Sequence, residues 1–121
     1  MAEYKLGEAE MRFAQIIWDN EPIASGELAK ISEQEFQWKK STTYTVLKRL
    51  CERGIFQNEG GQVTSLITKQ MFQAKQSEEI IDESFGGSLP SFVAAFTSQK
   101  KLSDKEIEEI KKLIEGIDKR N

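Results

Sequence analysis

Positive charge and hydroxyl groups are concentrated in one segment, WKKSTTYTVLKRLCERG at residues 38–54. Five cations stand there against one acid, Glu52, in a chain of formal net charge -3. The cations are Lys39, Lys40, Lys48, Arg49 and Arg53. Ammonium, guanidinium and hydroxyl groups are donors that bind phosphate oxygens and base edges, so the segment is typical of nucleic-acid binding. The alternative is a helix face that is only solvated, because runs of charged residues often bind no partner.

Residue types that support catalysis or metal binding are scarce. The chain has no His and a single Cys, which excludes nucleophile–His catalysis and a Cys-rich or His-rich metal site. Adjacent acids such as Glu78 and Glu79 diverge on a helix, and Gly60-Gly61 lacks the Lys-Ser/Thr of a phosphate-binding loop. We therefore expect no enzyme, no cofactor and no metal.

The single thiol, Cys51, lies inside the basic segment between Leu50 and Glu52. A small thiol beside an apolar residue is usually a packing residue. Redox sensing is the alternative, and it requires a reactive thiolate.

Length and composition favour a small cytoplasmic protein. The 121 residues fit one domain, or a small domain with an appendage, at 38% hydrophobic and 31% charged residues. The first twelve residues contain three Glu and do not resemble a secretory signal. The longest apolar run is FVAAF, so we expect no membrane insertion.

Apolar spacing predicts three helices in the first half of the chain. The first spans about residues 7–19, and the second runs from its N-cap Ser25 to near Phe36. The third spans residues 40–53 and ends at Gly54. Its inward stripe consists of Thr43, Val46, Leu47 and Leu50. Its opposite, polar face consists of Ser41, Tyr44, Thr45, Lys48 and Glu52.

The run IFQNEGGQVTSLI follows the third helix and predicts a β-hairpin. Gly60 and Gly61 supply the positive φ angles that a tight turn requires. Three helices and a hairpin follow the order of a winged helix-turn-helix domain. We therefore predict a mainly α fold with a small β-hairpin wing, in which residues 1–67 form a winged-helix DNA-binding domain.

Residues 68–121 are expected to be entirely helical and to form a C-terminal helical dimerisation region. One helix ends at Gly86-Gly87, a second begins near Ser88, and a third begins with a capping box of Ser103 and Glu106. Short helices with isolated apolar stripes close a core best against a symmetry mate. The stripes consist of Leu89, Phe92, Val93, Phe96, Ile107, Ile110, Leu113, Ile114 and Ile117.

The helix-turn-helix geometry assigns a role to each polar residue of the third helix. The second helix of the motif enters the major groove of double-stranded DNA, with its first residues facing the bases. The residues nearest the bases are then Lys40, Ser41, Thr42 and Tyr44. Phosphate contacts are expected from Lys39, Thr45, Lys48 and Arg49.

Three segments resemble the penicillinase repressors, the BlaI/MecI/CopY group. They are LGEAEMRFAQIIW, WKKSTTYTVLKRLCERGIF and GSLPSFVAAFTSQKKLSDKEIEEIKKLIE, and the matching segments extend from about residue 6 to 116. The second segment contains the pattern TxxTxLxRLxxxG, which begins at Thr42. The resemblance implies a homodimeric winged-helix repressor that binds operators with dyad symmetry, with the C-terminal helices making the dimer.

The chain departs from the family pattern at its C-terminal end. Copper-responsive members end in a Cys-rich metal motif, whereas this chain ends in IDKRN. The β-lactam-responsive members are more similar, and this resemblance implies an inducing protease that cuts an Asn-Phe bond. The aligned bond is Ala95-Phe96, which keeps the Phe and lacks the Asn. A cut there would remove residues 96–121 and weaken the dimer.

The wing departs from the family pattern as well. The family often has a basic residue and an aromatic residue after the hairpin glycine, where this chain has Gln62 and Leu66. We expect a weaker phosphate contact from the wing, through Asn58, Gln62 or Thr64. A purely structural strand role is the alternative for each of these residues.

Together these patterns predict a sequence-specific transcriptional repressor that acts as a homodimer on dyad-symmetric operators. The resemblance suggests that these operators control β-lactam-resistance genes and that proteolysis relieves repression. The alternative is a winged-helix protein-interaction module that binds an acidic partner through the same basic face, because a fold does not define a function.

Overall fold

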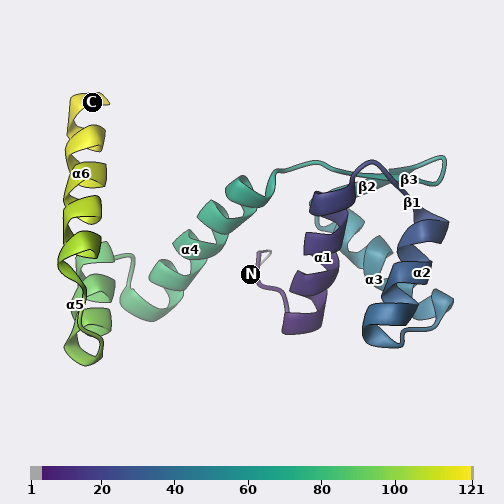
Figure 1. Cartoon of the computed structure of the whole chain (residues 1–121), viewed down its shortest axis with the longest axis horizontal. Coiled ribbons are helices and arrows are strands. Elements are labelled where there is room, and N and C mark those ends of the chain that lie inside the picture. The colour runs from purple at the N-terminus through teal and green to yellow at the C-terminus, as the bar shows by residue number, and fades with distance from the viewer. Residues whose placement is uncertain (1–3, 121) are drawn as a thin grey trace. The chain divides into compact units, whose positions relative to one another are not determined.

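The computed structural model describes residues 4–120, with the side chains of residues 4–117. The described part is mainly helical with a small sheet, as predicted (Figure 1). The helices are α1 Glu8–Asn20, α2 Ser25–Phe36, α3 Lys40–Glu52, α4 Lys69–Phe85, α5 Leu89–Gln99 and α6 Asp104–Arg120. The strands are β1 Ile23–Ala24, β2 Phe56–Glu59 and β3 Gln62–Ser65.

The chain forms two compact units, and the boundary between them along the sequence lies inside α4, between Glu79 and Ile80. Phe72, near the start of α4, is fully buried in the core of the first unit, which explains why the first turns of α4 belong to that unit. The predicted division between residues 67 and 68 concerns DNA binding and dimerisation rather than packing, and it stays a prediction.

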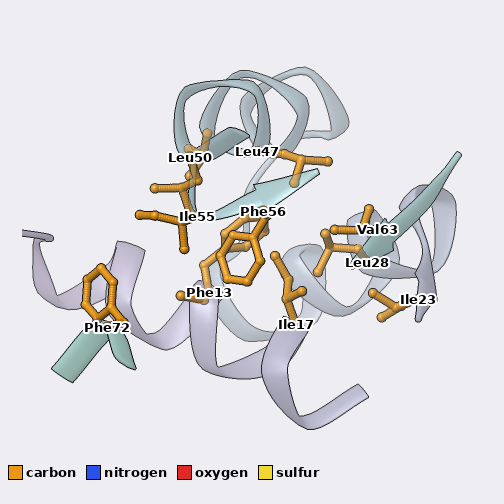
Figure 2. Packing of buried hydrophobic residues seen from close by; sticks show 12 residues of the cluster. Phe13, Ile17, Ile23, Leu28, Leu47, Leu50, Ile55, Phe56, Val63 and Phe72 are labelled. Atoms are coloured by element: carbon orange, nitrogen blue, oxygen red, sulfur yellow. The ribbon is translucent and has the colours of Figure 1, made fainter. Parts of the chain in front are cut away.

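The core of the first unit collects apolar side chains from all three predicted helices and from the hairpin (Figure 2). Phe13 and Ile17 come from α1, and Phe56 comes from β2. The other buried apolar members include Ile23, Leu28, Leu47, Leu50, Ile55, Val63 and Phe72. Burial of a large apolar side chain contributes roughly 1.5–3 kcal/mol, so this cluster holds α3 against α1, α2 and the sheet.

The sheet is antiparallel with the strand order β1-β3-β2. Its hairpin turns at Gly60 and Gly61, whose φ angles of 58° and 83° confirm the positive φ predicted for a tight turn. β1 was not predicted, because two residues are too short to carry an alternating pattern. It pairs Ile23 with Val63, so it hydrogen-bonds the edge of β3 that faces away from β2.

The predicted N-cap of α2 was wrong by one residue. Ser25 is the first helical residue, Ala24 occupies the N-cap, and no side chain caps this end. The reason is the strand pairing that precedes the helix, because the Ser25 N–H donates to the carbonyl of Gly61 at 2.8 Å. The start of α2 is therefore attached to the tip of the wing.

The connection between α2 and α3 is fixed by an aromatic cluster. Gln37 ends α2 in the left-handed conformation, with φ of 57°, and its N–H donates to the carbonyl of Glu33. The ring of Trp38 then packs on Phe36 at 4.6 Å and on Phe13 at 5.5 Å, measured between ring centroids. The direction in which α3 leaves this turn is therefore set by core packing.

The caps of the C-terminal helices follow the sequence signals. Oγ of Ser88 accepts from the N–H of Ser91 at 3.1 Å at the start of α5. The capping box of α6 is formed, because Ser103 N donates to Glu106 Oε1 at 3.0 Å and Glu106 N donates to Ser103 Oγ at 3.1 Å. These bonds satisfy N–H groups that an uncapped helix leaves unpaired.

Candidate nucleic-acid interface

α3 separates cleanly into a buried and an exposed side. The predicted inward stripe of Thr43, Val46, Leu47 and Leu50 is buried, which confirms that prediction. The exposed side carries Ser41, Thr42, Thr45, Lys48, Arg49 and Glu52. Lys39 and Lys40, at the start of the helix, are exposed as well. The structure thus exposes the predicted contacts of α3 except Tyr44, which was predicted on the polar face and is half-buried.

The three lysines of this surface have no ion pair with any side chain of residues 4–117. Within residues 4–117, no carboxylate lies within 4.0 Å of Lys39, Lys40 or Lys48. The ammonium of Lys40 lies 5.9 Å from the centre of the Tyr44 ring, which is a weak cation–π contact. Unpaired, exposed ammonium groups can bind phosphates without first breaking an internal salt bridge.

The two arginines differ from the lysines because each has a protein partner. Nη1 of Arg49 lies 3.7 Å from Oε2 of Glu10, on α1. Nη1 of Arg53 donates to the backbone carbonyl of Lys5 at 3.3 Å. Arg49 therefore contacts the first turn of α1 and Arg53 contacts the segment before it, which sequence periodicity did not reveal.

The hydroxyl groups of α3 are not equivalent. Thr45 Oγ1 donates to the Ser41 carbonyl at 2.9 Å, and the half-buried Tyr44 donates its hydroxyl to Ser25 Oγ at 3.4 Å. Within the described part of the chain, the hydroxyls of Ser41 and Thr42 have no such partner. Ser41 and Thr42 thus present the hydroxyls that an external acceptor or donor meets first.

The wing and α3 share a groove of about 200 Å³. Its lining includes Lys48 and Asn58, so the exposed wing residue Asn58 lies along the same surface as the cation. Gln62 is exposed, whereas the hydroxyl of Thr64 accepts from Gln57 Nε2 at 3.2 Å. Asn58 and Gln62 are therefore the wing residues with accessible polar groups.

Cys51 lines the same groove and is half-buried. Its burial, with a smaller effect from the neighbouring Glu52, raises the pKa of the Cys51 thiol. A raised pKa lowers the fraction of reactive thiolate at neutral pH. This environment favours the packing role over redox sensing.

The described residues contain neither a cluster of metal-ligating side chains nor a helix that could span a membrane. Residues 4–117 contain no group of three or more His, Cys, Asp or Glu side chains arranged to hold a metal ion. None of the helices in the described range has both the length and the hydropathy needed to span a membrane.

The family model of the penicillinase repressors matches residues 6–116. The chain belongs to the penicillinase repressor family. It is therefore a DNA-binding transcriptional repressor and not an enzyme, which confirms the resemblance noted in the sequence.

Three relatives cover nearly the whole of this repressor. The methicillin resistance regulatory protein MecI of Staphylococcus aureus is 26% identical over 115 residues, which are 92% of this chain and 94% of the relative. The penicillinase repressor of Bacillus licheniformis is 26% identical over 115 residues, or 92% and 90% of the two chains. The penicillinase repressor of Staphylococcus aureus is 22% identical over 122 residues, or 98% and 97%.

The repressor exposes most of the residues predicted to form its dimer. Eight of the nine are exposed, among them Leu113 at 68% and Ile114 at 55%. The ninth, Phe92, is half-buried and lies edge-on to Phe85 at 5.4 Å between ring centroids. Among the described residues, none of α5 is buried. The second unit of this repressor therefore leaves its main apolar stripes uncovered.

The bond of the repressor that aligns with the family's cleavage bond, Ala95-Phe96, lies in the middle of α5. Both residues are exposed, but the backbone around them is hydrogen-bonded, since the carbonyl of Phe96 accepts from Lys100 N at 3.1 Å. The side chains at this bond are accessible to solvent, but the helical hydrogen bonds protect its backbone from a protease.

Proposed function

We propose that this repressor acts as a homodimer on operators with dyad symmetry and inserts one α3 helix into the major groove at each half-site. The observation that carries the proposal is that Lys39, Lys40 and Lys48 have no ion pair within residues 4–117. They lie on an exposed helix side that also presents the hydroxyls of Ser41 and Thr42. Free cations supply phosphate affinity, and short hydroxyls allow close approach to base edges.

The residues of the interface divide into two roles. Base contacts come from the first turns of α3, through Lys40, Ser41, Thr42 and Tyr44. Phosphate contacts come from Lys39, Thr45, Lys48 and Arg49, with Gln62 of the wing as a weaker addition. The hydroxyl of Thr45 donates to the Ser41 carbonyl, and phosphate oxygens only accept, so a phosphate contact requires this hydroxyl to turn away from the helix backbone.

The dimer is proposed to form through the exposed apolar residues of α5 and α6. Large exposed apolar patches on a soluble protein usually mark an interaction surface. A two-fold pair buries the same stripe on both subunits, and it also matches the symmetry of a dyad operator.

We propose that the regulated genes include β-lactam-resistance genes and that proteolysis at Ala95-Phe96 relieves repression. The support is the similarity to a methicillin resistance regulatory protein and to penicillinase repressors. A protease cuts an extended backbone, so the middle of α5 must first unfold locally. The cut would separate residues 96–121, which include all of α6.

Footprinting of the DNA upstream of the protein's own operon tests this function. The expected result is protection of two half-sites separated by one helical turn or a multiple of it. Repeating the footprint with extracts of cells exposed to a β-lactam, together with an immunoblot for a shortened chain, tests the induction route. A folded dimer that protects no DNA would favour the acidic-partner alternative instead.

A further inference from the structure

The carboxylate of Glu10 connects the start of α1 with the DNA-facing side of α3. Its Oε1 accepts from the backbone N–H of Gly7 at 3.2 Å, which caps α1. Its Oε2 lies 3.7 Å from Nη1 of Arg49. The side chain of Glu10 is 22% exposed, whereas that of Arg49 is 50% exposed. A mostly buried, immobilised anion thus holds a half-exposed cation.

The second oxygen of Glu10 depends on this cation. Oε2 is buried and has no hydrogen-bond partner within the described residues. A buried carboxylate oxygen is costly unless a positive group compensates it. Arg49 is the cation that the structure brings within 4.0 Å of it, so the guanidinium is held toward the first turn of α1.

We propose that Glu10 is a positioning residue for DNA binding, which holds the guanidinium of Arg49 in the orientation that contacts a backbone phosphate. The inference rests on the proposed function, because it assigns Arg49 a phosphate. A guanidinium has five N–H donors, so one edge can face Glu10 while the other faces a phosphate oxygen.

The expected advantage is entropic. A free arginine side chain loses considerable rotamer freedom when it binds a phosphate. Glu10 is itself fixed by the Gly7 cap, so the arginine is ordered before the DNA arrives. The three lysines lack such a partner, which makes Arg49 the one preorganised phosphate donor among the predicted contacts of α3 within the described residues.

Simple electrostatics predicts the opposite effect of Glu10 on DNA affinity, and this difference makes the proposal testable. A carboxylate near DNA repels phosphates, so removal of its charge alone would raise the affinity. Positioning predicts a loss instead, and only when Arg49 is present.

A double-mutant cycle with Glu10→Gln and Arg49→Ala tests the inference. Gln at this position of a capping box can still accept the Gly7 N–H, so Glu10→Gln removes the charge and keeps the cap. The probe is a labelled duplex of mixed sequence, because a phosphate contact needs no particular bases. Fluorescence anisotropy at two salt concentrations gives the dissociation constants, and thermal unfolding verifies that each variant folds.

We expect Glu10→Gln to weaken binding about two- to fivefold in the parent chain. In the Arg49→Ala background it should leave binding equal or slightly tighter, because only the repulsion of phosphates is lost there. The matched control is Lys48→Ala, whose effect should multiply independently with that of Glu10→Gln. Tighter binding by Glu10→Gln in the parent chain, or an equal loss in both backgrounds, would overturn the positioning role. Binding of the mixed duplex by the parent chain, measured in the same titration, separates failure of this inference from failure of the proposed function.

Discussion

The hydroxyl of Tyr44 donates to Oγ of Ser25 at 3.4 Å, which joins the proposed reading helix α3 to the first residue of α2. Ser25 also donates its N–H to the Gly61 carbonyl at the wing turn. One residue thus contacts α3 and the tip of the wing. Because the Tyr44 hydroxyl has a protein partner, the ring edge is the part of Tyr44 left to contact a thymine methyl.

Tyr44→Phe should therefore have little effect on either stability or operator choice. The lost hydrogen bond is long, so we expect the free energy of unfolding to fall by less than about 1 kcal/mol. Tyr44→Ala removes the ring and should reduce the preference for sites with thymine at the contacted position. Binding-site selection from a randomised duplex pool measures this preference for both variants. A changed preference in Tyr44→Phe would show that the hydroxyl, and not the ring, reads the DNA.

Lys48→Ala should weaken binding to all sequences alike. Lys48 is exposed and lacks an ion pair within residues 4–117, so it can engage a phosphate fully. Loss of one phosphate contact should reduce the slope of log K against log salt by about 1. Titrations of an operator and an unrelated duplex at several salt concentrations measure this slope.

The control for this experiment is Lys101→Ala, which removes the same charge from the connection between α5 and α6. It lies outside the predicted interface and should leave the slope unchanged. A loss confined to the operator after Lys48→Ala would mean that Lys48 contacts a base.

The sequence was sufficient to predict those features of the fold that a local pattern of residues determines. The stripe of α3 repeats at helical spacing, the hairpin has two glycines at its turn, and Ser103 with Glu106 forms a complete capping box. Each of these features depends on residues a few positions apart. Periodicity and turn chemistry are reliable at that range.

The features that the sequence did not reveal depend on contacts between distant segments. β1 has two residues and exists because β3 offers it a partner at Val63. Phe72 looks like any apolar residue of α4, and only its packing in the core of the first unit explains its complete burial. The Glu10–Arg49 pair joins two helices, so no spacing rule could identify it.

Cys51 should react slowly with alkylating reagents in the folded protein. Burial raises the pKa of its thiol, so the thiolate fraction at neutral pH is below that of a free cysteine. Alkylation by iodoacetamide, followed by mass spectrometry, should accelerate strongly in denaturant. The folded rate should increase as the pH rises, because deprotonation produces the nucleophile. Folded and unfolded rates of similar size would instead favour a sensing role.

Glu106 should make the stability of the protein depend on pH. The N–H and hydroxyl of Ser103 bond its carboxylate and lower the pKa of Glu106. A group whose pKa is lower in the folded state stabilises above its unfolded pKa, and this contribution is lost as the pH falls through the folded pKa. Glu106→Gln is the control because it keeps the acceptor without titrating. The difference in melting temperature between the two proteins should be present at neutral pH and shrink below the ordinary Glu range.

Ile114→Glu should separate dimerisation from folding of the first unit. Ile114 is 55% exposed and is not part of the buried core, so the substitution leaves the packing of the winged-helix unit intact. In a dimer it would place a carboxylate in the apolar contact, where burial of a charge is costly. We expect a monomer in sedimentation velocity, and a loss of about a hundredfold in operator affinity because the two half-sites are no longer bound together.

Lys112→Gln provides the matched control for Ile114→Glu. Both substitutions change the net charge by the same amount, but residues two positions apart point to opposite sides of a helix. Lys112 is exposed opposite the apolar stripe, so its variant should remain a dimer and bind the operator as the parent does. If the parent chain sedimented as a monomer at concentrations that protect both half-sites, α5 and α6 would have to serve another purpose. Their uncovered stripes would then require a different partner, since nothing else in the described part of the second unit buries them.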